Sequence, residues 1–139
     1  MLPVGVELPG DFESAGEWLA DAQAMEAAGA EALFVAAGSL ERQALLAALA
    51  AVTWRAAIVA PEASPTVELL ARGRLQTEPA ESWHRVPEPE SRAHWRELHA
   101  QAEEAGAGGV IVPMSPRLLD LLRNEDVEDD RSDIQLAQG

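Results

Sequence analysis

The sequence contains no cysteine, no lysine and no tyrosine. Without cysteine there is no disulfide, thiolate nucleophile or cysteine-ligated metal. Without lysine there is no Walker-A lysine and no Schiff-base chemistry, and without tyrosine there is no phenolic acid. No stretch approaches the roughly 20 apolar residues that cross a bilayer, and no basic segment precedes an apolar one near the start. We therefore expect a cytoplasmic protein with no membrane partner.

Positive charge is also scarce, because 24 Asp and Glu residues face 10 basic residues and the net charge is −14. Nucleic-acid binding depends on clustered positive charge, so we expect no nucleic-acid partner. His94 and His99 are five positions apart and fall on different faces of a helix, so no metal site is expected. The sequence has no Gly-x-Ser-x-Gly elbow, dinucleotide fingerprint or phosphate-loop motif.

One pattern occurs twice in the chain. A helical stretch ends at Gly29 and is followed by the apolar run Leu33-Phe34-Val35, and 77 positions later Gly106 precedes Val110-Ile111-Val112. Glycine tolerates the positive φ that a helix C-terminus needs, and short apolar runs suit strands covered on both faces. The pattern predicts β/α units with parallel strands.

Hydrophobic spacing and cap signals predict the individual elements. The predicted strands are 4–8, 32–36, 55–60 and 108–113, with 75–78 as a fifth candidate. The predicted helices are 11–28 (capped by Asp11), 40–52 (capped by Ser39), 66–71 (after Ser64-Pro65), 91–105 and 117–123 (after Ser115-Pro116). The inward residues are expected to be Phe12, Ala15, Leu19, Ala22 and Met25 (or Glu26) on the first helix, and Trp95, Leu98 and Ala102 on the fourth. Most of residues 74–90 is expected to be irregular, because Pro79, Pro87 and Pro89 interrupt it.

These elements predict one α/β domain over residues 1–123 and a mobile acidic tail over 124–139. A closed eight-stranded barrel takes about 200 residues or more. The chain therefore suits an open parallel sheet or a truncated, TIM-barrel-like arrangement of about five βα units. Such a fragment exposes an apolar edge or face, so we expect a homodimer.

Three segments resemble the luciferase-like monooxygenases, which are flavin- or deazaflavin-dependent oxidoreductases on a (β/α)8 barrel. The first is the helix–glycine–strand segment 26–35. The second is an entry into the third strand, matched by Leu46, Leu49, Ala50, Ala51, Thr53 and Arg55. The third is the segment 68–75, in which Gly73 and Arg74 keep the end of the family's leucine-serine-glycine-glycine-arginine pattern. The resemblance covers residues 4–75, and more loosely 98–122, so the middle of the barrel is missing from this chain.

The resemblance implies a shortened relative that binds FMN or coenzyme F420, with reduced or no activity. It implies a flavin-phosphate contact at Gly73 and Arg74, where the alternative is a helix-ending glycine and a surface arginine. The alternatives in function are a non-catalytic dimeric interaction module or a binder of small phosphorylated metabolites. No catalytic residue is assigned.

The residues themselves indicate two further candidate contacts. The free amides at the start of the helix after Ser115 can hold a phosphate, with Arg117 adding charge. Alternatively, Ser115 only caps its helix and Arg117 pairs with Asp120 or Asp126. Glu7 ends the first strand, where barrels and open α/β sheets place their active mouth, or it is an ordinary strand-end charge. The pairs Trp83-His84 and His94-Trp95 indicate either a ring-stacking pocket with a proton-transferring imidazole or simple packing.

Overall fold

The computed structural model of the protein describes residues 2–35, 40–78 and 82–124. Its strands are β1 (Val4–Glu7), β2 (Ala32–Phe34), β3 (Ala57–Val59), β4 (Leu75–Gln76), β5 (Trp83–Arg85) and β6 (Gly109–Pro113). Its helices are α1 (Ala15–Ala27), α2 (Leu40–Val52), α3 (Pro65–Ala71), α4 (Arg92–Glu104) and α5 (Pro116–Arg123). None of the helices in these ranges is long and apolar enough to cross a membrane.

The six strands form one sheet in the order β4-β3-β2-β1-β6-β5, and every neighbouring pair is parallel. The predicted parallel α/β fold is therefore confirmed, with one strand more than expected. From β1 to β4 each new strand is added on the same side of the previous one, and β5 to β6 moves in that direction too.

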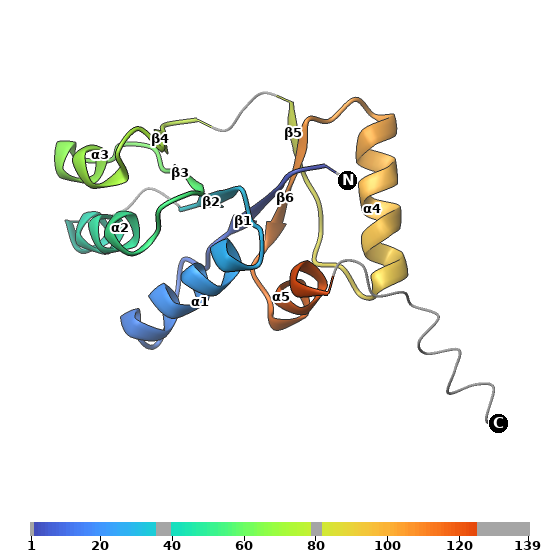
Figure 1. The fold of residues 1–139 in the computed structure, drawn as a ribbon, viewed down its shortest axis with the longest axis horizontal. Helices are drawn as coiled ribbons and strands as arrows, with labels where there is room; N and C mark the ends of the chain where they lie inside the picture. Colours follow the sequence, from blue (N-terminus) through green and yellow to red (C-terminus); the bar gives the residue numbers. More distant parts are fainter. Residues whose placement is uncertain (1, 36–39, 79–81, 125–139) are drawn as a thin grey trace.

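All five helices lie on one side of the sheet. Figure 1 shows them as an arc that runs from α3 through α2, α1 and α5 to α4, in the order of the strands they follow or precede. This follows from the handedness rule, because right-handed crossovers that all step in one direction place their helices on one face. Consecutive units of a (β/α)8 barrel have the same arrangement. Here β4 and β5 form the two edges of the sheet.

The main core lies between the sheet and the helices. Val4, Val6 and Leu8 point into it from β1 and its end, as period-two alternation requires. The predicted inward residues of α4, namely Trp95, Leu98 and Ala102, are buried there as expected.

Glu26 is a charged residue in this core, with a side chain only 5% exposed. Its carboxylate accepts hydrogen bonds from the backbone amides of Trp54, Arg55 and Ala56, at 3.1, 2.8 and 2.8 Å. Arg55 in turn donates through Nη2 to the carbonyl oxygens of Glu26 and Ala30, at 2.7 and 3.2 Å. The Glu26 side chain of α1 thus fixes the position of the segment that leads into β3.

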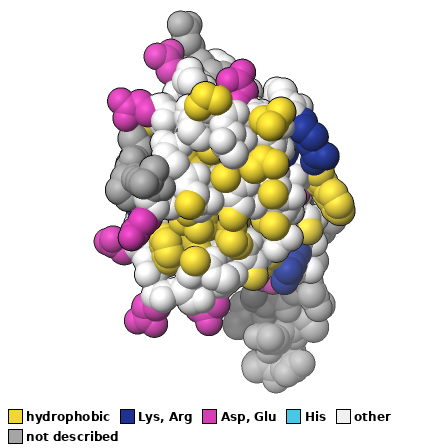
Figure 2. Space-filling model, turned by 90° about the vertical axis from the view of Figure 1, so that its left-hand side faces the viewer, with side chains coloured by type: hydrophobic (Ala, Val, Ile, Leu, Met, Phe, Trp, Pro, Cys, Tyr) yellow, Lys and Arg dark blue, Asp and Glu magenta, His cyan; other side chains and the backbone are white. Residues whose placement is uncertain are grey.

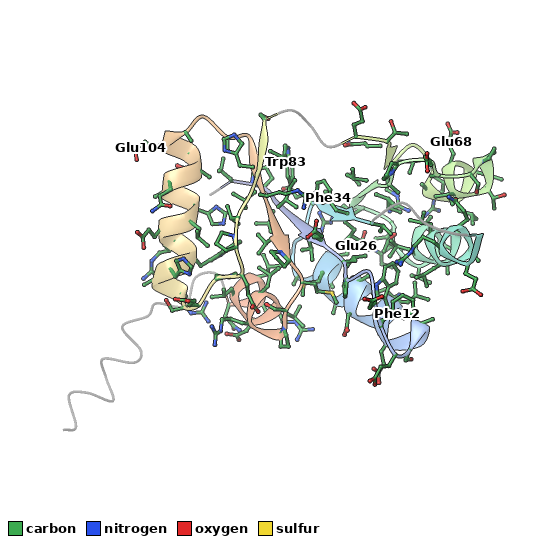
Figure 3. All side chains as sticks on the ribbon, turned by 180° about the vertical axis from the view of Figure 1, so that it is seen from behind. Phe12, Glu26, Phe34, Glu68, Trp83 and Glu104 are labelled. Carbon is green, nitrogen blue, oxygen red and sulfur yellow. The ribbon has the colours of Figure 1, made fainter. Side chains whose placement is uncertain are left out.

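The opposite face of the sheet, which we call the inner face, carries none of the helices that the structure describes. Its buried residues are Ala32, Phe34, Val59 and Ile111, with Ala57 and Trp83 packed against them. The rings of Phe34 and Trp83 meet with centroids 6.2 Å apart, although β1 and β6 separate their strands. Figure 3 labels both side chains at the strands of the sheet. Their convergence indicates that the inner face is concave.

Two glycines make room for these rings. A Cβ on Gly5 would lie 2.4 Å from Cε1 of Phe34 and 2.9 Å from Cζ3 of Trp83. A Cβ on Gly109 would lie 2.5 Å from Cδ2 of Trp83. The rings therefore lie directly on the backbone of β1 and β6.

The start of the first helix was wrongly predicted. Ser14, and not Asp11, is the N-cap of α1, and its hydroxyl accepts a hydrogen bond from the amide of Glu17 at 3.2 Å. The inward residue of the first turn is Trp18, which is 2% exposed, whereas Phe12 is 41% exposed and Ala15 is exposed. Trp18 occupies the inward position of the first turn because its ring fills the core while its Nε1 still donates to the carbonyl of Pro9 at 3.0 Å.

The strand β5 was missed, because prolines on both sides of it suggested an irregular segment. It has only three residues and lies at an edge of the sheet, where flanking prolines break no ladder hydrogen bond. The predicted caps Ser64 and Ser115 are confirmed, each with proline as the first helical residue. The expected cap Ser39 and the acidic tail beyond Asn124 lie outside the described residues.

The close fit of the rings over Gly5 leads to the first prediction. Gly5→Ala should destabilise the protein by about 1–3 kcal/mol, because the new methyl group displaces Phe34 and Trp83. Gly10→Ala is the matched control, since nothing lies within 4 Å of its added Cβ. Urea unfolding followed by circular dichroism measures both. Equal stability of the two variants would show that the inner face is loosely packed.

His99 is a buried titratable group on α4. Its side chain is 2% exposed, its ring meets that of Trp95 edge-on at 4.3 Å, and neither ring nitrogen has a hydrogen-bond partner. Burial lowers the pKa of His99, and the charge of Glu103 only partly opposes this effect. The imidazole is therefore neutral in the folded protein at pH 7.

The second prediction concerns acid stability. Because the pKa of His99 is lower in the folded chain than its unfolded value of about 6.5, the unfolded state binds more protons below that pH. The free energy of unfolding should therefore fall on acidification below pH 6.5, with a contribution from His99 of at most about 1.4 kcal/mol per pH unit. His99→Leu should remove this contribution, while replacement of the exposed His84 should keep it. Unfolding at a series of pH values measures the difference, and parallel pH profiles for wild type and His99→Leu would contradict the prediction.

Candidate functional site

A cavity of about 490 Å³ opens at the carboxyl ends of the strands, on the inner face. It is lined by Glu7, Leu8, Pro9, Gly10, Phe34, Val35, Val59, Pro61, Thr77, Arg85, Pro113 and Met114. These residues come from the six strands or from the segments that directly follow them. The carboxyl end of a parallel sheet is where barrels and open α/β sheets bind their ligands.

Two charged side chains line this cavity. Glu7 ends β1 and points to the inner face, and its carboxylate oxygen Oε2 accepts a hydrogen bond from Nη1 of Arg85, which ends β5. The Arg85 side chain is 62% exposed and that of Glu7 44% exposed, so a ligand in the cavity can reach both. The pair is formed across β6, and only the curvature of the sheet and the topology bring it together.

The segment that follows β1 forms one wall of the cavity, and several contacts hold it in place. The carbonyl of Pro9 accepts from Nε1 of Trp18, and the carbonyl of Gly10 accepts from Nη2 of Arg42 at 2.7 Å. On the other side, the amide of Met114 donates to the carbonyl of Glu7 at 3.0 Å. The cavity is therefore bounded by backbone that the side chains of Trp18 and Arg42 and the amide of Met114 hold in place.

The chemistry of the lining is simple. Phe34, Val35, Val59, Pro113 and Met114 offer flat or branched apolar surface, and Glu7, Arg85 and Thr77 offer polar groups. A guanidinium binds carboxylate and phosphate oxygens with charge-assisted hydrogen bonds. Across the described ranges no group of three metal-ligating side chains comes together. The cavity therefore suits an apolar or planar ligand with an anionic group.

Of the five residues predicted to contact a cofactor, only Glu7 lines this cavity. Gly73 and Arg74 precede β4 and therefore lie at the opposite, amino end of the sheet. Gly73 has a φ of +85° and follows Arg72, which ends α3 in the left-handed conformation, so it serves the turn.

The Arg74 guanidinium is fully engaged in hydrogen bonds to the protein. Nε donates to the carbonyl of Ala71 at 2.9 Å. Nη1 donates to Oγ1 of Thr53 and the carbonyl of Ala56, both at 3.0 Å. Nη2 donates to the carbonyls of Ala50 and Thr53, at 2.9 and 3.0 Å. Burial lowers the pKa of Arg74, and the nearby Glu26 carboxylate opposes this shift. Arg74 thus closes the carboxyl end of α2 and joins it to β3 and α3.

Ser115 and Arg117 lie near the carboxyl end of β6 but do not line the cavity. The hydroxyl of Ser115 accepts from the amide of Leu118 at 3.0 Å and caps α5. Nη1 of Arg117 donates to the carbonyl of Glu90 at 2.6 Å. The expected pairing of Arg117 with Asp120 is wrong, because Asp120 pairs with Arg92 at 3.0 Å, and Asp126 lies outside the described residues. The binding roles of Gly73, Arg74, Ser115 and Arg117 stay predictions.

The histidine–tryptophan pairs do not form a site together. Trp95 is core, and Nδ1 of His94 accepts from the amide of Glu90 at 2.9 Å at the start of α4. Trp83 packs on the inner face against Phe34, whereas His84 is exposed.

Sequence reasoning missed Arg85, Thr77 and Phe34 as lining residues. A signal was present for Phe34, since it lies in the predicted strand 32–36 next to Val35. For Arg85 the only signal was that it lies two residues after Trp83 and therefore shares its face of a strand. Because β5 was not predicted, this signal could not be used.

Comparison of the chain with protein-family models, with curated proteins and with solved structures finds no match.

The contacts of Arg74 lead to the third prediction. Arg74→Ala should lower the free energy of unfolding by about 2–4 kcal/mol, because it leaves buried carbonyls unpaired. Arg74→Lys should recover only part of this loss, since an ammonium cannot match the planar fork. Arg72→Ala, two residues away and exposed, should change stability by less than about 0.5 kcal/mol. Denaturant unfolding of the three variants measures the series. An Arg74→Ala protein as stable as Arg72→Ala would refute the structural role and reopen a role in binding.

Proposed function

We propose that the protein binds a flavin or deazaflavin cofactor, FMN or coenzyme F420, in the cavity at the carboxyl ends of its strands, as a shortened relative of the luciferase-like oxidoreductases. The observation that carries the proposal is the cavity of about 490 Å³, with apolar walls and the ion pair of Glu7 and Arg85 among its described lining residues. Small-molecule sites have this character and typically measure about 300–1,000 Å³.

The fold supports this proposal in two ways. The strand order and the one-sided helices are those of consecutive barrel units, with the cavity at the end where barrels place their sites. In addition, the segments that carry the resemblance are joined by hydrogen bonds at Ala56, because Glu26 accepts from its amide and Arg74 donates to its carbonyl. Glu26 also bonds to Arg55, and Arg74 to Thr53. The residues on which the resemblance rests therefore lie together in the fold, at the amino ends of β3 and β4.

The residues that line the cavity fit such a cofactor in kind. The apolar surface of Phe34, Val59 and Met114 suits a planar ring system, and Arg85 suits its phosphate. When bound, the flavin or deazaflavin supplies the redox chemistry. The protein orients the ring and excludes water from it. Glu7 pairs with Arg85 before the ligand enters, and then competes with the phosphate of the ligand for that arginine.

A small phosphorylated metabolite is the alternative ligand for the same groups. Riboflavin separates the two, because it has the ring system of FMN without the phosphate. Ring recognition gives measurable binding of riboflavin, whereas phosphate recognition alone gives binding of inorganic phosphate and none of riboflavin.

A non-catalytic dimeric module is the second candidate function. The observation that favours it is the exposed apolar surface of α2 and α3, which includes Leu69 at 76% exposure. This function predicts self-association without any flavin binding.

The fourth prediction tests the cavity by two substitutions with opposite effects. Arg85→Gln should weaken FMN binding roughly 10- to 100-fold, because it removes the one cation of the lining that faces the ligand. Glu7→Gln should tighten binding by up to about fivefold, since Arg85 is then released from its partner. Titration of the purified protein with FMN and with F420, followed by quenching of their fluorescence, measures the affinities.

Arg123→Gln is the matched control, because it makes the same change in net charge on the exposed last turn of α5. It should leave the affinity unchanged. If neither cofactor binds wild-type protein at high concentration, the proposed function is wrong. If both bind but Arg85→Gln and Arg123→Gln behave alike, the cofactor lies elsewhere.

A further inference from the structure

Helix α2 is apolar around its whole circumference after its first turn. The nine residues from Ala44 to Val52 are all Ala, Leu or Val. Leu46, Leu49 and Ala50 face the core and are buried. On the opposite side of the helix Ala44, Ala51 and Val52 are exposed and Ala48 is half-buried. A helix that is apolar on every side is normally covered on every side.

The apolar surface extends beyond α2 onto both neighbouring helices. On α3, Leu69 is 76% exposed, and after α2 the side chain of Trp54 is 79% exposed. Between α1 and α2 lies a groove of about 440 Å³, lined by Phe12, Ala15, Leu19, Glu41, Arg42, Ala44, Leu45 and Ala48. We call this surface, made by α2, Leu69 and the groove, the α2 face. Figure 2 shows hydrophobic side chains across the centre of this side of the molecule.

Most charge lies at the margins of the α2 face, with acidic residues mainly at one margin and arginines mainly at the other. Arg42, in the first turn of α2 beside Glu41, departs from this separation, and its Nη2 donates to the carbonyl of Gly10. In Figure 2 the acidic side chains lie along one margin, and arginines lie on the opposite margin. Parallel crossovers make α2 and α3 run in the same direction, so their ends can be compared directly. Glu41 and Glu68 lie in the first turns of these helices, whereas Arg55 and Arg72 are exposed beyond their carboxyl ends.

We propose that the α2 face is the interface with a second copy of this chain, in which the two α2 helices cross antiparallel on a two-fold axis over Ala48. Two surfaces that carry acid at one end and arginine at the other attract each other only when one is reversed, and a two-fold axis across α2 makes that reversal. It sets Glu41 and Glu68 of one copy against the arginine margin of the other. It also sets the two α2 helix dipoles antiparallel, which is the favourable sense for helices packed side by side.

The small side chains at the centre of the face fit this arrangement. Ala44, Ala48 and Ala51 follow one another at helical spacing, so two α2 helices can approach closely there while Leu69 and Val52 cover the flanks. The separated charges also argue against an arbitrary acidic or basic partner, because either would meet like charge at one margin. The inference is independent of flavin binding, since the cavity lies at the carboxyl ends of the strands, outside the α2 face.

The fifth prediction is the mass of the protein in solution, measured by sedimentation equilibrium. Wild-type protein at high micromolar concentration should show twice the 14.8 kDa of one chain. Ala48→Glu should raise the dissociation constant at least roughly tenfold, because it places two like charges at the two-fold axis. Ala100→Glu, on the exposed side of α4, is the control and should leave the mass unchanged.

A charge exchange tests the antiparallel arrangement and does not depend on the folding of Ala48→Glu. Glu68→Arg alone should weaken the dimer, and addition of Arg72→Glu should restore it, while circular dichroism confirms that each variant is folded. A wild-type mass of one chain would overturn the proposal. A dimer that Ala48→Glu does not weaken would place the interface elsewhere, and a double variant weaker than Glu68→Arg would exclude the antiparallel pairing.

Discussion

The buried carboxylate of Glu26 is the contact on which the arrangement of the first half of the chain depends. It accepts from three successive amides, those of residues 54–56, and so fixes the start of β3 against the end of α1. Each hydrogen bond to a charged group contributes about 1.5–3 kcal/mol, and an unpaired buried carboxylate would cost more. Arg74 completes this constraint from the other side, because it ties the end of α2 to the segment before β4. Three consecutive βα units are thereby joined at their amino ends by two charged side chains.

This concentration of polar contacts at one end of the sheet leaves the other end open. At the amino end of the sheet, the Glu26 carboxylate and the Arg74 guanidinium are fully hydrogen-bonded, mostly to backbone groups. At the carboxyl end Glu7 and Arg85 have only each other among the described residues and are substantially exposed. Barrels separate stability from function in the same way, with ligands at the carboxyl ends of the strands. The positions on which the proposed kinship with the luciferase-like family rests lie largely at the amino end, so they report on how the units are built more than on what they bind.

The inner face shows how the six strands that the structure describes fill the concave side of their sheet. In a closed barrel, layers of side chains from all the strands would occupy this space. Here Phe34 and Trp83 reach toward each other above Gly5 and Gly109, so two aromatic rings packed on the backbone of two glycines replace those layers. The cavity begins where these rings end. Its shape is therefore a consequence of the same packing that completes the core.

The sequence by itself determined the elements whose signals are local. Serine–proline caps, glycine after a helix and short apolar runs each act within a few residues, and the parallel α/β fold, α2 and α4 could be derived from them. Only the tertiary structure decided which charged residues are structural and which line the cavity. Arg74 and Arg85 are alike in sequence, yet one is surrounded by carbonyl oxygens of α2 and β3 and the other faces the cavity beside Glu7. That difference arises from contacts between residues that are 18 to 78 positions apart in the chain. Because no local pattern encodes the distance between β1 and β5, the site becomes visible only when the sheet has formed.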